Sequence, residues 1–281
     1  MEQRDIKLIA FDLDGTLLNS EKELTPRTRA ALEAAAQAGI ELVPATGRFY
    51  RGMPEAVRAL PFVRYAITIN GAQVLDTRTG ESLYSAEIPT EEAIEFFSYL
   101  DTLPVIYDCY INGWGCMTAW MQDRAEEYIS NIHSLNMVRE LREGVPELKE
   151  HLRAGGYRPQ KMQLFTRDIP LRDELVHSLA RRYPQYAVST SLPNNVEINS
   201  HDADKGRALL GLAEKLGIER EQTMAFGDGL NDLTMLRAAG TGVAMANGHP
   251  EVRAAADLPA EDCDSDGVAK MIEALLRERK G

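Results

Sequence analysis

The sequence is poor in cysteine, in long apolar runs and in positive charge, and each shortage disfavours a class of protein. It has only three cysteines and no CxxC pair, which argues against a disulfide framework. No early apolar run is long enough for a membrane span, and residues 1–5 do not resemble a signal peptide, so we expect a cytoplasmic location. Lysine and arginine number 31 against 43 acidic residues, and the resulting net charge of -12 disfavours nucleic acid or an anionic membrane as the main partner.

Two of the cysteines flank a predicted β-hairpin. Asn112-Gly113 is a strong two-residue turn signal, and counting outward from it places Cys109 opposite Cys116. This is a hydrogen-bonded position of the antiparallel pair, where the Cα atoms stand further apart. We therefore expect free thiols.

The most informative stretch is a short apolar strand that ends at two carboxylates. Residues 8–11 read as a strand buried on both faces, and Asp12 and Asp14 follow directly, with a glycine after them. Residues i and i+2 of an extended chain project to the same side, so the two side chains are expected to converge. Two carboxylates at so short a distance repel each other, and a divalent cation commonly relieves the repulsion.

Strands alternate with helices on either side of a long interruption, which predicts an α/β fold with a doubly wound parallel sheet. Thr25-Pro26 begins a helix that ends at Gly39. Further predicted elements of this part are strands at 41–45, 65–69, 223–226 and 241–245, a helix after Asp204 and two helices near the end. The predicted strands stop at small polar or glycine-containing loops, and ligands of open α/β sheets bind at such strand ends.

The interruption has a different pattern. Residues 85–193 combine a capped helix, the hairpin, a strand at 161–165, a helix at 171–182 and a strand at 187–191. These 109 residues (193 − 85 + 1) are enough to fold alone. We predict a discontinuous catalytic core, residues 1–84 and 194–281, that carries an inserted α+β domain over an antiparallel sheet.

Four short motifs stand in order along the predicted core, and together they resemble the haloacid dehalogenase-like phosphatase superfamily. The motifs are D12-L-D14-G-T16, A45-T46-G47-R48, D204-K205-G206 and G227-D228-G229-L-N231-D232. N70-G71-A72 before the long insert, V243-A-M-A-N247 and D266-G267-V268-A extend the resemblance to the Cof-type subfamily with a C2B cap. The resemblance implies a Rossmann-like core and hydrolysis of a phosphate monoester.

The resemblance also implies a role for each motif. Asp12 is the expected nucleophile, and Asp14 is the expected general acid and then base, which requires its site to raise a pKa that is ordinarily about 3.9. Mg²⁺ is expected on Asp12, the backbone carbonyl of Asp14 and Asp228, with Asp232 orienting metal-bound water or Lys205. The expected phosphate-binding residues are Leu13, Thr46, Gly47, Lys205 and Asn231.

Two further residues are candidates for substrate contact, and one position departs from the family pattern. Arg48 could hold the phosphate or close the cap, and Lys161 matches a cap lysine that reaches the substrate in this subfamily, although a surface lysine at a strand end explains it nearly as well. Cys263 stands where Cof-like chains often carry asparagine.

Alternatives stay open at this point. Taken singly, Thr46-Gly47 could be an ordinary turn, Lys205 a surface lysine and Asp228-Gly229 a tight turn. The favoured function is a magnesium-dependent phosphatase for small phosphorylated metabolites, most plausibly sugar phosphates, with no nucleic acid or membrane partner. A phosphosugar mutase on the same fold is the second hypothesis, and a non-catalytic protein that binds a phosphorylated metabolite is the third. The sequence indicates neither the substrate nor an oligomeric state.

Overall fold

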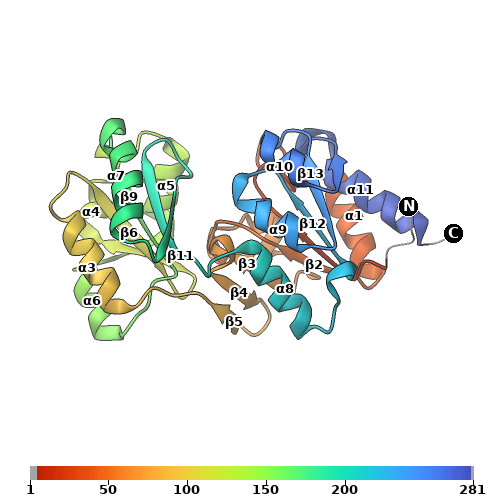
Figure 1. Ribbon diagram of the computed structural model, residues 1–281, viewed down its shortest axis with the longest axis horizontal. Coiled ribbons are helices and arrows are strands. Elements are labelled where there is room, and N and C mark those ends of the chain that lie inside the picture. The colour runs from red at the N-terminus through yellow and green to blue at the C-terminus, as the bar shows by residue number, and fades with distance from the viewer. Residues whose placement is uncertain (1–4, 280–281) are drawn as a thin grey trace. The chain divides into compact units, whose positions relative to one another are not determined.

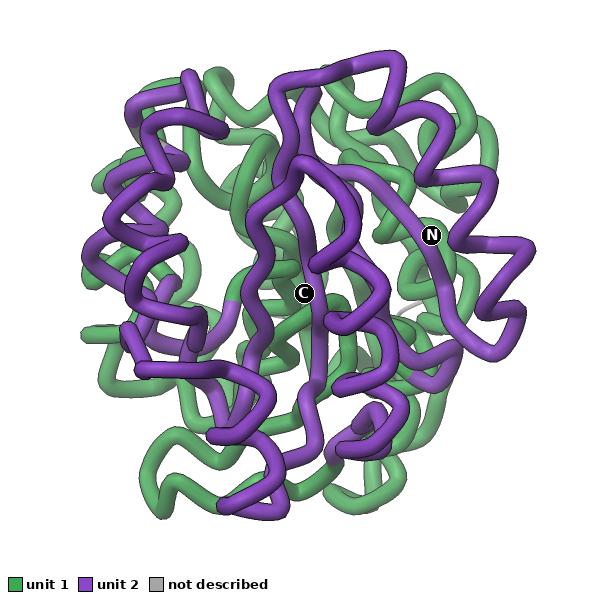
Figure 2. Tube along the Cα trace, turned by 90° about the vertical axis from the view of Figure 1, so that its left-hand side faces the viewer, with its two compact units in different colours: residues 1–48, 53–84, 203–281 green, residues 49–52, 85–202 purple. Residues whose placement is uncertain are grey.

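The computed structural model describes residues 5–279, so residues 1–4, on which the expectation about a signal peptide depends, lie outside it. The chain divides into two units, shown in Figure 2. Unit 1 comprises residues 1–48, 53–84 and 203–281, and unit 2 comprises residues 49–52 and 85–202. Each unit has its own sheets and its own hydrophobic core.

Unit 1 is built on a five-stranded parallel sheet in the order β14-β13-β12-β1-β2. Its strands are β1 (Leu8–Phe11), β2 (Glu41–Pro44), β12 (Thr223–Gly227), β13 (Thr241–Met245) and β14 (Leu258–Ala260). All four residues of β1 are fully buried, as expected for a central strand covered on both faces. In register, Phe11 stands beside Phe226 of β12 and Pro44 of β2, so three neighbouring strands end at one edge.

Helices cover both faces of this sheet (Figure 1). On one face α1 packs against α11, and on the other α8 packs against α9 over a core that includes Leu8, Ala225 and Leu209. The helices of unit 1 are α1 (Pro26–Gln37), α2 (Glu55–Arg58), α8 (Lys205–Lys215), α9 (Leu233–Ala238), α10 (Pro250–Ala255) and α11 (Gly267–Glu278). Thr25 caps α1 through its side chain, with Pro26 in the first turn, as the sequence predicts. The predicted doubly wound α/β core is thus confirmed.

The third strand behaves differently from the prediction. β3 (Tyr65–Thr68) meets the parallel sheet at a single bridge, Ala45 with Ile67, and otherwise pairs antiparallel with β4 (Gln73–Asp76), which is followed by β5 (Ser82–Ser85). The tight turn Ile69–Gly71 reverses the chain immediately after β3, so the next strand returns antiparallel. The sequence prediction missed β4, β5 and the short edge strand β14.

Unit 2 is organised on a six-stranded sheet in the order β10-β11-β9-β6-β7-β8. Its strands are β6 (Ile106–Ile111), β7 (Trp114–Thr118), β8 (Arg142–Val145), β9 (Lys161–Phe165), β10 (Tyr186–Ser189) and β11 (Asn195–Ser200). Every pairing is antiparallel except β7 with β8, which is parallel. The predicted hairpin is confirmed: Cys109 is opposite Cys116, and both are buried free thiols. The helices of unit 2 are α3 (Thr90–Leu100), α4 (Ala119–Asp123), α5 (Ile132–Leu141), α6 (Leu148–Gly155) and α7 (Ile169–Arg182).

The main segment of unit 2 begins at Ser85, as the predicted insert does, but it ends later, and the unit includes a second short segment. The predicted insert stops at residue 193, whereas β11 continues the sheet to Ser200 and the unit extends to Asp202. β11 pairs with both β9 and β10, which is why it belongs with them. Residues 49–52 also group with unit 2, where Phe49 stacks edge-to-face on Tyr110 with ring centroids 5.0 Å apart.

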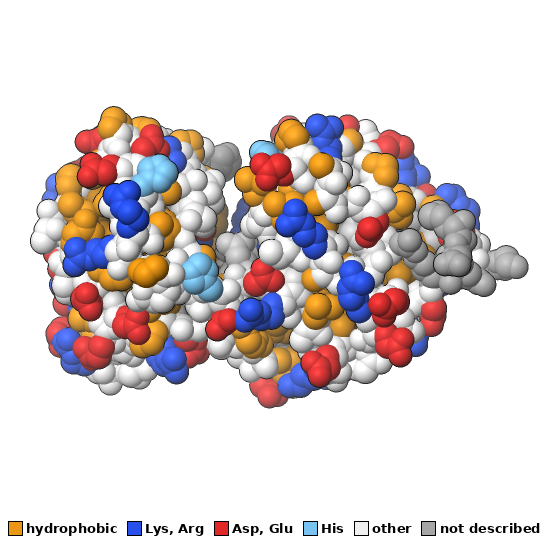
Figure 3. Space-filling view, viewed as in Figure 1, with side chains coloured by type: hydrophobic (Ala, Val, Ile, Leu, Met, Phe, Trp, Pro, Cys, Tyr) orange, Lys and Arg blue, Asp and Glu red, His pale blue; other side chains and the backbone are white. Residues whose placement is uncertain are grey.

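The surface carries charges of both signs. On the view in Figure 3, acidic and basic side chains are interspersed with apolar ones. Among the described residues, the large hydrophobic side chains that are exposed are Trp120, Ile132, Ile169 and Leu230. No helix within residues 5–279 is both long enough and apolar enough to span a membrane.

Candidate active site at the carboxyl edge of the parallel sheet

Asp12 lies at the end of β1 and forms an ion pair with a buried lysine. Lys205 Nζ stands 2.7 Å from Asp12 Oδ1 and 2.6 Å from Asp232 Oδ1. The side chain of Lys205 is fully buried at the start of α8, and Asp232 is buried at the end of the short helix η5 (Leu230–Asp232). Three segments far apart in sequence therefore meet at one ammonium group.

Asp232 also fixes the loop after β12. Its Oδ2 accepts hydrogen bonds from the backbone N–H groups of Asp228 (3.0 Å) and Gly229 (2.9 Å). Both carboxylate oxygens of Asp232 are thus engaged, one by Lys205 and one by the loop. The predicted role of Asp232, to orient metal-bound water or Lys205, stays a prediction, and the structure places one of its oxygens on Lys205.

Asp228 follows β12 and has a carboxylate oxygen within 4.8 Å of one of Asp12. Its Oδ1 accepts a hydrogen bond from the hydroxyl of Thr16 at 2.8 Å. Gly15, with a φ of +87°, approaches so closely that an added Cβ would lie 2.5 Å from Asp228 Oδ2. A side chain at position 15 would therefore push Asp228 out of place, which explains the glycine of the D-x-D-G-T motif.

The carboxylates of Asp12, Asp228 and Asp232 form the one acidic cluster within residues 5–279 whose ligand atoms lie close enough to hold a metal ion, all within 4.8 Å of one another. Oxygen donors of this kind suit a hard cation such as Mg²⁺. Because both oxygens of Asp232 are already engaged, Asp12 and Asp228 are the better placed of the three to bind one. The donor set therefore fits the predicted metal.

The electrostatics of the cluster reflect its burial. Burial raises the pKa of Asp12 to about 7, because the charges of Asp232 and Asp228 add to the effect of burial and Lys205 only partly offsets it. Burial also raises the pKa of Asp228, against the opposing hydrogen bond from Thr16. For Lys205, burial favours a lower pKa, but Asp12 and Asp232 outweigh it and raise the pKa. Lys205 therefore stays protonated at neutral pH.

Asp14 does not join this cluster. Its carboxylate forms a bidentate ion pair with Arg48, with Nε to Oδ2 at 2.8 Å and Nη2 to Oδ1 at 2.9 Å, and Lys22 Nζ lies 3.1 Å from Oδ1. Burial favours a higher pKa for Asp14, but Arg48 and Lys22 outweigh it, so the pKa lies below its ordinary value. A raised pKa was expected because Asp14 was assigned the role of general acid, and the ion pair with Arg48, 34 residues away, could not be placed from sequence alone.

The Thr46-Gly47 loop follows β2 and is closed by short contacts. Thr46 is buried, and its hydroxyl oxygen accepts a hydrogen bond from the backbone N–H of Arg48 at 3.2 Å. The backbone N–H of Thr46 donates to Ile67 O of β3 at 2.9 Å. Leu13, also predicted at the phosphate, is fully buried, and its carbonyl accepts hydrogen bonds within the first loop from the N–H groups of Thr16 and Leu18.

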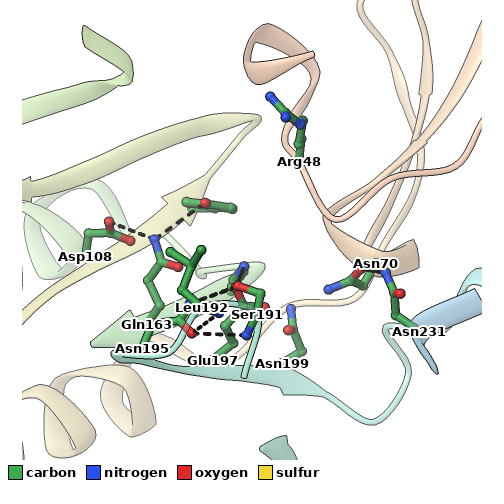
Figure 4. Close-up of polar contacts among 12 residues, drawn as sticks. Arg48, Asn70, Asp108, Gln163, Ser191, Leu192, Asn195, Glu197, Asn199 and Asn231 are labelled. Atoms are coloured by element: carbon green, nitrogen blue, oxygen red, sulfur yellow. Dashed lines mark hydrogen bonds and ion pairs between the residues drawn. The ribbon is translucent and has the colours of Figure 1, made fainter. Parts of the chain in front are cut away.

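Asn231 is exposed and is linked to Asn70, which the sequence places in the N70-G71-A72 motif but to which no role in the site was assigned. Its Nδ2 donates to Asn70 Oδ1 at 3.1 Å (Figure 4). Asn70 belongs to the turn Ile69–Gly71, in which all three residues have positive φ: 54°, 56° and 92°. A non-glycine residue in the left-handed region costs on the order of 1–2 kcal/mol, and the cost is higher for a β-branched residue such as Ile69.

Asn247 and Thr16 are further residues of the site that the prediction did not assign. Asn247 Nδ2 donates to Gly15 O at 2.8 Å, and Asn247 Oδ1 accepts from the backbone N–H of Cys263 at 3.0 Å. The usable signal was position, because Asn70 and Asn247 both follow strand ends, as Asp12 does. Since Cys263 contributes only its backbone, its departure from the family asparagine leaves this contact intact.

Lys161 lies in unit 2 and is occupied by an internal partner. It starts β9, is buried, and its Nζ lies 2.6 Å from Glu197 Oε1 of β11. Glu197 is held in turn by Ser191 and Asn195, part of the polar network drawn in Figure 4. The side chain is thus not the surface lysine that one reading of the sequence supposed, and its contact with substrate stays a prediction.

Comparison with known proteins agrees with the motif pattern. Residues 9–272 match the sequence profile of the haloacid dehalogenase-like hydrolases. Phosphatase YwpJ of Bacillus subtilis (strain 168) is 30% identical over 286 residues, covering 96% of this chain and 100% of that protein. From the same organism, 5-amino-6-(5-phospho-D-ribitylamino)uracil phosphatase YcsE is 30% identical over 272 residues, with 96% of each chain covered. A haloacid dehalogenase-like hydrolase from Bacteroides thetaiotaomicron superposes with a TM-score of 0.84 at 28% identity, covering 96% of this chain and 99% of that one.

Proposed function

Because this chain belongs to the haloacid dehalogenase-like hydrolase family and is a phosphoric monoester hydrolase, we propose that it is a Mg²⁺-dependent phosphatase for small phosphorylated metabolites. The observation that carries the proposal is the convergence of Asp12, Lys205 and Asp228 at the carboxyl edge of the sheet. The named substrate of YcsE carries its phosphate on a ribityl chain, so we propose a phosphorylated sugar or sugar alcohol as the substrate class.

We assign the first step to Asp12. A carboxylate oxygen of Asp12 attacks phosphorus in line, the bond from phosphorus to the leaving oxygen breaks, and an aspartyl-phosphate forms. Lys205 holds Asp12 in position and offsets negative charge as the phosphoryl group approaches. Thr46, the Gly47 amide and Asn231 are proposed donors to the phosphoryl oxygens. Asp12, Asp228 and the backbone carbonyl of Asp14 would hold Mg²⁺, which would supply further positive charge for the nucleophile and the phosphoryl group.

Asp14 is the proposed acid and base. It donates a proton to the leaving alcohol oxygen in the first step and accepts one from water in the second, as water displaces Asp12 and releases phosphate. Arg48 holds Asp14 in the structure, so we propose that Arg48 moves to the phosphoryl group when substrate binds, which allows Asp14 to take up a proton.

The test is turnover of a panel of phosphorylated sugars and sugar alcohols with Mg²⁺, with p-nitrophenyl phosphate as a general substrate. We expect activity that EDTA abolishes and Mg²⁺ restores, and no activity in Asp12→Asn. Full activity after exhaustive chelation would contradict the metal requirement. Transfer of the phosphoryl group to an added sugar in place of water would identify a mutase instead.

A further inference from the structure

The turn Ile69–Gly71 contacts three separate segments of the candidate site. Toward the loop after β2, the backbone N–H of Asn70 donates to Thr46 O and that of Ile69 donates to Arg48 O, both at 3.0 Å. The side chain of Asn70 lies against Gly47, where an added Cβ would be 2.9 Å from Asn70 Oδ1. The left-handed turn therefore holds the backbone of residues 46–48, the proposed phosphate-binding loop, through these contacts.

The same turn lies against the start of α8. Gly71 has a φ of +92°, and a Cβ there would stand 2.4 Å from the backbone carbonyl atoms of Asp204 and 2.7 Å from Lys205 N. Only glycine fits at this approach. The turn is thus in contact with the backbone that carries Lys205.

The third contact is the side-chain hydrogen bond from Asn231 to Asn70. It fixes which way the Asn231 carboxamide is turned, because Nδ2 faces Asn70 Oδ1 at 3.1 Å. The opposite end of the amide lies over Gly229, where an added Cβ would be 2.6 Å from Asn231 Oδ1. An amide nitrogen has two hydrogens, and this bond uses only one of them.

We propose that Asn70 is a positioning residue for phosphate binding: its Oδ1 takes one Nδ2 hydrogen of Asn231 and so presents the second to the phosphoryl group. The inference rests on the proposed function, in which Asn231 contacts phosphate. The proposal also explains why an asparagine occupies this left-handed position: asparagine tolerates the conformation, and its side chain carries a hydrogen-bond acceptor.

Asn70→Gly tests the proposal, since glycine tolerates the backbone conformation and removes the acceptor together with the side chain that lies against Gly47. With Mg²⁺ present, we expect KM for p-nitrophenyl phosphate and Ki for inorganic phosphate to rise about three- to tenfold, as for one lost hydrogen bond, with a smaller change in kcat. Asn112→Gly is the matched control: Asn112 also has a positive φ (50°), in the β6–β7 turn, and its replacement should leave both constants unchanged.

A double-mutant cycle separates positioning from a general structural effect. If Asn70 acts through Asn231, Asn70→Gly should change phosphate affinity little in an Asn231→Ala background. Equal losses in both backgrounds, or a lowered Tm with unchanged KM and Ki, would overturn the inference. The same four proteins are also compared by their Kd for inorganic phosphate, measured by calorimetry, so the result does not depend on turnover. A wild-type protein that binds phosphate but hydrolyses no ester would refute the proposed function alone, whereas one that binds no phosphate would refute the inference as well.

Discussion

Arg48 and Asp14 form a bidentate ion pair, with both donor–acceptor distances below 3 Å. An arginine in this geometry holds a carboxylate in its ionised form. Asp14 is therefore a poor proton donor while Arg48 remains in place, and its use as an acid requires the pair to open. By contrast, Asp12, only two residues away, is held by Lys205 at the buried acidic cluster. The two carboxylates therefore lie in different electrostatic environments: the pKa of Asp12 is raised and that of Asp14 is lowered.

Asp14→Asn should separate the two chemical steps. A sugar alcohol is a poor leaving group that needs a proton, so its first step should slow by roughly 10²–10⁴-fold when the general acid is lost. A nitrophenolate leaves without protonation, so p-nitrophenyl phosphate should still phosphorylate Asp12, with a burst of about one equivalent followed by slow hydrolysis. Rapid quench and mass spectrometry should find phosphate on Asp12. Equal rate losses with both substrates and no adduct would remove Asp14 from the acid–base role.

Metal binding should weaken as the pH falls below neutrality. Asp12 has a pKa of about 7 in the metal-free protein, and a metal ligand must be deprotonated to bind. We expect the apparent Kd for Mg²⁺, measured by calorimetry, to rise about tenfold for each pH unit below about 7. Asp12→Asn should bind Mg²⁺ more weakly and without this dependence. A Kd that is constant between pH 5 and 8 in the wild-type protein would contradict the raised pKa.

The same pKa makes a prediction about stability. The folded-state pKa of Asp12 lies above its ordinary value of 3.8, so the folded protein binds more protons than the unfolded chain between these values. The contribution of Asp12 to the free energy of unfolding should therefore fall as the pH rises from about 4 to about 7. Across this range the Tm of the metal-free wild-type protein should fall more steeply with pH than that of Asp12→Asn. Parallel Tm profiles would contradict it.

Lys205 should be as important for folding as for chemistry. Lys205→Met leaves the buried carboxylates of Asp12 and Asp232 without their shared cation, and loss of one partner of a buried pair costs about 3–5 kcal/mol. Urea unfolding at pH 8 in the absence of metal should show a loss of this order. Lys215→Met is the control, because Lys215 is exposed near the end of the same helix, α8, and its replacement should change stability by less than about 0.5 kcal/mol.

Mutations of the Lys161–Glu197 pair can distinguish a structural role of Lys161 from a role in substrate contact. If its role is internal, Lys161→Met should destabilise the protein by about 3–5 kcal/mol, and adding Glu197→Gln should recover much of the loss because the unpaired buried charge is then gone. KM for the panel substrates should stay near the wild-type value in the double variant. A large rise in KM that Glu197→Gln does not relieve would instead place Lys161 at the substrate.

The sequence predicted the core of the site because its residues follow strand ends. Asp12 comes directly after β1 and Asp228 directly after β12, with Asn231 three residues further on, and parallel strands bring such positions to one edge. Short apolar runs that end at polar or glycine-containing loops, and the helix start at Thr25-Pro26, likewise predicted most elements of unit 1. Pairings between distant side chains were not predictable: Arg48 with Asp14 and Lys161 with Glu197 depend on rotamers and on neighbours in space. The left-handed turn at Ile69 was also missed, since an isoleucine there runs against local preference, and with it the antiparallel return of β4.

The division of the chain constrains how this protein can be re-engineered. The polypeptide passes from one unit to the other after Arg48, Gly52, Tyr84 and Asp202. A chimera that replaces residues 85–202 alone would leave Phe49 facing a foreign partner in place of Tyr110. A transplant between relatives therefore has to carry residues 49–52 as a second, matched insert. Its junctions would then fall directly beside Arg48 and within three residues of Lys205, so splice sites and chemistry cannot be varied independently in this chain.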